Sequence, residues 1–109
     1  MTETFTTCDF ERDVYFELPH PTLAWSVLRV SVREVGDRWE QAHEFQLCIT
    51  GMGTPFMGSY PSREAAGRNG LCCLRHALMR VSREDRETAQ KHAEVIWEII
   101  NPQQLSLKL

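Results

Sequence analysis

The sequence lacks any apolar run near the roughly 20 residues that a membrane-spanning helix needs. Its opening residues, MTETFTT, have neither the basic region nor the apolar stretch of a secretory signal peptide. The 109 residues also contain no internal repeat, low-complexity segment or linker. We therefore expect a single cytoplasmic domain over residues 1–109, without a membrane partner and long enough to bury a core without metal or disulfide staples.

A disulfide framework and a zinc motif are also absent. The cysteines are Cys8, Cys48, Cys72 and Cys73. Adjacent residues on a helix point about 100° apart, so a bond between the last two would be strained. Structural zinc sites usually use a C-x-x-C pair, which the sequence does not contain. We expect no metal and no cofactor, although the sequence leaves open whether Cys72, Cys73, His76 and His92 meet at an ion.

No set of residues indicates catalysis. Cys72 and His76 stand four residues apart, but an activated thiolate needs an electropositive open site and an oxyanion hole, and nothing adjacent supplies them. The pair Gly51 and Gly53 lacks both the third glycine of a dinucleotide loop and a G-K-[ST] motif. His43, on the inward side of its strand, is typical of a core histidine. The sequence therefore predicts a protein that is not an enzyme.

The clearest positive signal is a helical pattern over residues 62–81. Its apolar positions form one continuous arc, namely Ala66, Gly70, Cys73, Leu74, Ala77, Leu78 and Val81. Ser62 is a credible N-cap. Gly67 and Gly70 lie inside the arc, where each costs about 1 kcal/mol of helix propensity, so a close approach to a partner layer is the expected compensation. We expect this helix to dock flat on a sheet and to leave no cleft where reactive groups could converge.

Period-two alternation and turn residues place the strands before this helix. Strands are expected at 14–18, 24–35, 39–50 and 56–60, with turns at Gly36-Asp37 and at 51–55. A second helix is expected at 83–101, with Ser82 and Asp85 in a capping-box-like arrangement. The predicted fold is α+β, with a three- to four-stranded antiparallel sheet followed by two helices packed on one face.

The second helix carries more apolar residues than one buried face needs. Val95 and Ile99 lie off the face that holds Ala93 and Ile96, so a second burial partner is expected. The C-terminal tail, 103–109, alternates leucine with polar residues and could add a strand within the chain or between two copies. The candidate partner or dimer surface is therefore Val95, Ile99, Leu105, Leu107 and Leu109.

Charge is divided unevenly along the chain. Within 1–20 five acidic residues face one arginine, and the acidic arm 1–13 could be mobile. Within 61–82 the balance is reversed, with Arg63, Arg68, Arg75 and Arg80 against Glu64. The net charge of −3 disfavours a polyanionic partner, since nucleic-acid affinity depends on a concentrated basic face. These four arginines are nevertheless the candidate surface for an alternative function, nucleic-acid binding.

The run EFQLCITGMGTPFMGSYPSREAAGRNGLCCLRHAL, from Glu44 to Leu78, resembles the second half of a double-stranded RNA-binding domain. That family grips phosphates with lysines at the start of this helix. Here Arg63 is followed by Glu64, and the segment before residue 24 favours strand and turn in place of the family's first helix. We carry over no site residues from the resemblance.

The leading hypothesis is a small non-enzymatic protein-binding module that acts by occupying a surface, as inhibitor, immunity or phage-accessory proteins do. Its partner would be another protein, including a second copy of itself. A homodimer through the surface on the second helix and tail is the corollary.

Overall fold

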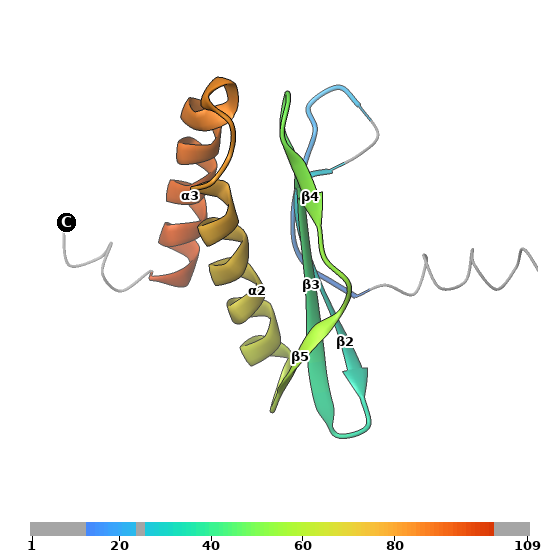
Figure 1. Ribbon diagram of the computed structural model, residues 1–109. Coiled ribbons are helices and arrows are strands. Elements are labelled where there is room, and N and C mark those ends of the chain that lie inside the picture. Colours follow the sequence, from blue (N-terminus) through green and yellow to red (C-terminus); the bar gives the residue numbers. More distant parts are fainter. Residues whose placement is uncertain (1–12, 24–25, 102–109) are drawn as a thin grey trace, which may run out of the picture.

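The structure, a computed structural model, describes residues 13–23 and 26–101. Within these ranges the elements are β1 (Asp13–Pro19), β2 (Ser26–Val35), β3 (Arg38–Gln46), β4 (Gly51–Gly53), β5 (Met57–Tyr60), α2 (Arg63–Leu78), a 3₁₀ turn η1 (Arg83–Asp85) and α3 (Arg86–Ile100). The strands form one antiparallel sheet, and both helices lie on the same side of it (Figure 1). The predicted α+β fold is confirmed. Neither described helix is long and apolar enough to cross a bilayer.

The sheet has the order β1-β2-β3-β4, and β5 pairs with the same strand, β3, as β4 does. β4 lies opposite the end of β3, and β5 lies opposite its beginning. Between them Thr54 donates its amide to the His43 carbonyl at 3.0 Å and accepts from the His43 amide through its hydroxyl at 3.1 Å. β4 and β5 therefore act as one interrupted fourth strand.

The alternation in β2 separates a buried face from a charged one. Leu28, Val30 and Val32 are fully buried under the helices. On the opposite face Arg29 and Arg33 pair with Glu44 and Glu40, their direct cross-strand neighbours, at 2.8 and 2.7 Å. Gly36 takes φ 66° in the two-residue turn between β2 and β3, a conformation that glycine adopts without strain. This part of the sequence-based prediction is confirmed.

The strand predicted over 39–50 is too long. β3 ends at Gln46, and the chain reverses at 47–50, where Leu47 donates to the Thr50 carbonyl at 2.8 Å. In a strand over 39–50 Ile49 would share the inward side with His43, but it is 60% exposed in this turn. The segment 51–53, expected as turn, is β4.

Asp85 is the reason for the earlier reversal. Its buried carboxylate accepts from the amides of Ile49 and Thr50 at 2.9 and 2.6 Å. Burial favours the neutral acid, but the hydrogen bonds outweigh burial and lower the pKa of Asp85. A residue 35 positions away thus holds the turn, which no local pattern reveals.

α2 packs closely on the sheet at its two glycines. Ser62 caps the helix by accepting from the Ala65 amide at 3.1 Å, as predicted. A Cβ on Gly67 would enter the ring of Tyr15, and a Cβ on Gly70 would lie 2.6 Å from Cγ1 of Val30. The close approach expected from the sequence is confirmed. The core between the layers includes Leu28, Val30, Phe45, Leu47, Leu71, Leu74, Leu78, Ala89, Ala93 and Ile96.

The break between the helices differs in detail from the prediction. α2 ends at Leu78, where Met79 and Arg80 donate to carbonyls three residues back and tighten the last turn. Ser82 makes no capping bond with its side chain and instead accepts from the Thr50 hydroxyl at 3.0 Å. The capping box expected at Ser82 and Asp85 is therefore replaced by contacts of both side chains with the 47–50 turn.

Candidate binding surface

A groove opens between α3 and one end of the sheet, with a volume of about 790 Å³. We call it the α3–β1 groove. It is lined by Leu18, Pro19, His20, Pro21, Val27, Gln46, Leu47, Cys48, Thr88 and His92. These residues come from the ends of three strands and from the first half of α3, which begins at the same end of the molecule as the turn after β1 (Figure 1).

The sheet supplies the apolar side of this groove. Leu18 pairs with Leu28 across β1 and β2, so its side chain shares the face that the helices cover. Phe16, two residues before it, pairs with Val30 in the same way. Both Phe16 and Leu18 are only partly buried. Among the described strands β1 pairs with β2 alone, so its other edge has no described neighbour.

α3 supplies the opposite side and extends it. Thr88, His92, Val95 and Ile99 recur at the spacing of one helical stripe. The buried residues Ala89, Ala93 and Ile96 form the adjacent stripe that faces the core. Val95 and Ile99 are 44% and 43% exposed, although both are β-branched aliphatics. They lie off the buried face, as the sequence predicted, on the same helical stripe as the groove residues Thr88 and His92.

The other predicted members of this surface, Leu105, Leu107 and Leu109, lie outside the described residues, as do positions 1–12 of the acidic arm. Burial lowers the pKa of His92, so this lining side chain favours its neutral form. The lining of the groove therefore combines apolar side chains with polar ones, among them Gln46, Thr88 and His92.

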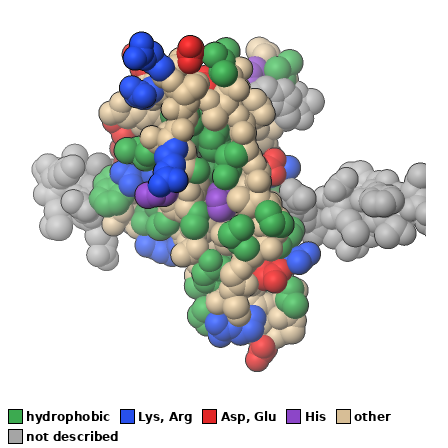
Figure 2. All heavy atoms as spheres, viewed as in Figure 1, with side chains coloured by type: hydrophobic (Ala, Val, Ile, Leu, Met, Phe, Trp, Pro, Cys, Tyr) green, Lys and Arg blue, Asp and Glu red, His purple; other side chains and the backbone are tan. Residues whose placement is uncertain are grey.

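A second hollow, of about 640 Å³, lies between α2 and the β3–β4 edge. Hydrophobic side chains reach the surface between α2 and β4 (Figure 2). Its lining comprises Phe45, Thr50, Met52, Cys72, Cys73, His76, Ala77 and Arg80. The expectation that α2 docks without leaving a cleft is wrong. The first half of α2 contacts the sheet closely at Gly67 and Gly70. The hollow opens beside the second half of this helix.

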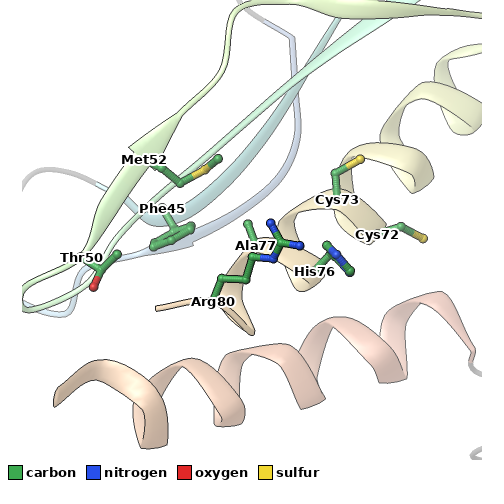
Figure 3. A pocket seen from close by; sticks show the side chains of 8 residues that line it. All are labelled: Phe45, Thr50, Met52, Cys72, Cys73, His76, Ala77 and Arg80. Atoms are coloured by element: carbon green, nitrogen blue, oxygen red, sulfur yellow. The ribbon is translucent and has the colours of Figure 1, made fainter. Parts of the chain in front are cut away.

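Three side chains of this hollow, Cys72, Cys73 and His76, carry a thiol or an imidazole group. Cys72 and Cys73 point in different directions (Figure 3), as adjacent helical residues do. The Cys73 thiol donates to the Asn69 carboxamide oxygen at 3.5 Å. Burial, and to a smaller extent the neighbouring Cys72, raises the pKa of Cys73 and so disfavours its thiolate form. Across residues 13–23 and 26–101 no three His, Cys, Asp or Glu side chains gather closely enough to hold a metal. Cys72, Cys73, His76 and His92 accordingly do not meet at an ion site there.

His43 is a core residue. It is 6% exposed, and its Nδ1 lies 2.9 Å from the Gln41 side-chain oxygen, which is also buried. Burial lowers the pKa of His43. Its buried position thus favours the neutral form of the ring.

Three of the four arginines predicted as the alternative surface make contacts with other residues of the chain. Arg63 grips Asp13 with two bonds of 2.7 and 2.8 Å, and Arg68 donates to the Ile100 carbonyl at 3.0 Å. Arg75 lies over the Trp97 ring, 4.8 Å from its centroid. Arg80 lines the hollow beside α2. These contacts tie α2 to β1 and α3, and they divide the cations between separate sites.

No family model, curated protein or solved structure matches this chain. Sequence reasoning found the exposed residues of α3 but missed the groove beside them. The groove walls come from positions near 18, 27, 47 and 92, which only the folded sheet and helix bring together.

Proposed function

We propose that this chain is a small non-enzymatic protein-binding module of the inhibitor, immunity or phage-accessory kind, and that it acts by occupying a surface. The binding surface would be the α3–β1 groove together with Val95 and Ile99. The observation that carries the proposal is the pair of half-exposed aliphatic side chains continuing the apolar groove along one helix stripe.

Apolar side chains in such a position favour a partner. Fully burying a Val or Ile side chain contributes roughly 1.5–3 kcal/mol, so completing the burial of each half-exposed residue is worth about 1 kcal/mol. The α3–β1 groove on the same side of α3 is concave, so it can bury more of a partner's surface than a flat patch can. A second copy of the chain is one candidate partner, because two identical apolar stripes can pack against each other about a two-fold axis.

The test compares three baits in a pull-down from the native host: the unaltered chain, V95E/I99E and V35E. Val35 is 49% exposed at the end of β2 and is no part of the groove, so V35E is a matched apolar-to-acidic control. We expect a partner that is retained by the unaltered chain and V35E, and bound at least about tenfold more weakly by V95E/I99E. Equal retention by all three baits would rule out this surface.

Self-association can be tested on the same proteins by light scattering. The proposal expects a dimer at high protein concentration that V95E/I99E abolishes and V35E leaves intact. A monomer in all three would remove the second copy as a partner.

Nucleic-acid binding is the alternative. It would require Arg63, Arg68 and Arg75 to exchange their contacts with Asp13, Ile100 and Trp97 for phosphates. Salt-dependent retention on RNA or DNA that disappears in R68Q/R75Q would favour it over the protein-binding proposal.

A further inference from the structure

We propose that the α3–β1 groove is a binding site for an extended peptide with leucine at every second position, and that its occupant in the free protein is the chain's own C-terminal segment, 103–109. The inference rests on the proposed function, because it names what covers the same surface before a partner arrives. Any partner would then have to displace this segment.

Leucine alternates with polar residues in the C-terminal segment. In an extended chain alternate side chains point to opposite sides, so Leu105, Leu107 and Leu109 would share one side and Ser106 and Lys108 the other. The groove lining is largely apolar, and Val95 and Ile99 are exposed aliphatic residues of α3. Leucines facing the groove would leave the serine and lysine in water.

The backbone changes conformation at the end of α3. Asn101 has φ −125° and ψ 60°, so the chain leaves the helix there. Pro102 follows, and proline has no amide to continue the helical bonds. α3 therefore ends at Ile100, and the helix does not continue through Asn101.

The distance from the end of α3 to the groove can be compared with the length of the segment. The groove residue His92 is eight positions before Ile100, which is about 12 Å along a helix at 1.5 Å per residue. Residues 102–109 can span up to about 26 Å when extended. The segment is therefore long enough to turn back, pass Ile99 and Val95, and reach the groove.

The strand edge offers the backbone partner. The edge of β1 away from β2 has no partner among the described strands, and Phe16 and Leu18 on β1 face the helix side. A strand added to this edge would form main-chain hydrogen bonds and place its leucines against these two side chains. An edge without a partner within residues 13–23 and 26–101, next to an apolar groove, is the arrangement that strand addition uses.

The covalent connection of the segment to α3 favours the chain's own segment over that of a second copy. A short covalent connection between two binding partners gives an effective concentration of roughly millimolar, above the concentration of a second copy in ordinary solutions. Occupation within the same chain is therefore favoured.

The test measures amide hydrogen exchange by mass spectrometry on the full-length chain and on full-length L105S/L107S/L109S. The matched control is S106A/K108A, which changes the residues expected to face water. We expect peptides covering β1 to exchange roughly tenfold faster in the leucine variant, because outward amides lose their partners, and at the unaltered rate in the control. V95E/I99E, which alters the docking surface, should reproduce the faster exchange.

Three outcomes would overturn the inference. The leucine variant could exchange at the unaltered rate, or the control could exchange as fast as the leucine variant. Protection could also be lost on roughly hundredfold dilution, which would assign the segment to a second copy. If V95E/I99E loses a partner in the pull-down while the leucine variant leaves exchange unchanged, the proposed function stands and only the occupation by residues 103–109 fails.

Discussion

Replacing Gly70 by alanine should destabilise the protein, although alanine is the better helix former. Gly70 is buried in the middle of α2, and an added Cβ would lie 2.6 Å from Cγ1 of Val30 and 3.0 Å from the Gln41 side-chain oxygen. Val30 is fully buried, and its β-branched side chain has little rotamer freedom. The helix must therefore move away from the sheet, or the sheet must deform.

Two opposing free energies set the magnitude. Helix propensity favours alanine over glycine by about 1 kcal/mol. Inserting a methyl group into a packed interior costs typically 1–3 kcal/mol. The net effect expected for G70A is a loss of about 1 kcal/mol, which corresponds to a fall of roughly 4–8 °C in Tm for a domain of this size.

A second background isolates the steric term. In V30A the Cγ1 atom is absent, and the Gln41 side chain needs to move only a few tenths of an ångström. G70A should then stabilise the V30A protein by up to about 1 kcal/mol, because the propensity gain is no longer opposed. The effect of G70A should therefore change sign between the two backgrounds.

Urea unfolding followed by circular dichroism gives the four free energies of this cycle. The reasoning would be refuted if G70A raised the stability of the unaltered chain. It would also be refuted if G70A had the same effect in both backgrounds, since the Val30 contact would then carry no cost.

Three further predictions concern single side chains. Because the pKa of Asp85 is lowered in the folded protein, its contribution to stability is present above the unfolded value of 3.8 and is lost as the pH falls through the folded pKa. D85N should therefore lower Tm at neutral pH and weaken the fall of Tm at acidic pH. An unchanged curve of Tm against pH would contradict this. Burial lowers the pKa of His43, so the stability of the protein should fall as the pH drops below 6.5. H43Q should reduce this dependence of stability on pH, and H76Q, which replaces an exposed histidine, serves as the control. S62A removes the N-cap of α2 and should cost about 1 kcal/mol in urea unfolding, a loss that S62D should largely avoid.

The sequence by itself determined the class of fold and the main boundaries. Alternation in β2 and the Gly36-Asp37 turn are local signals, and the structure follows them. The pattern of α2, its Ser62 cap and its two glycines also predicted close docking on the sheet. Val95 and Ile99 could be identified as exposed because helical periodicity alone separates them from Ala93 and Ile96.

Tertiary structure decided the features that join distant segments. The reversal at 47–50 depends on the Asp85 carboxylate, and the local residues alone favoured a longer strand. The hollow beside α2 depends on the gap between its second half and β4, and the α3–β1 groove depends on three strand ends meeting one helix. Periodicity reports which side of an element is buried, because it reflects the geometry of that element alone. It does not report which other element lies opposite, because that depends on how all the buried faces pack together.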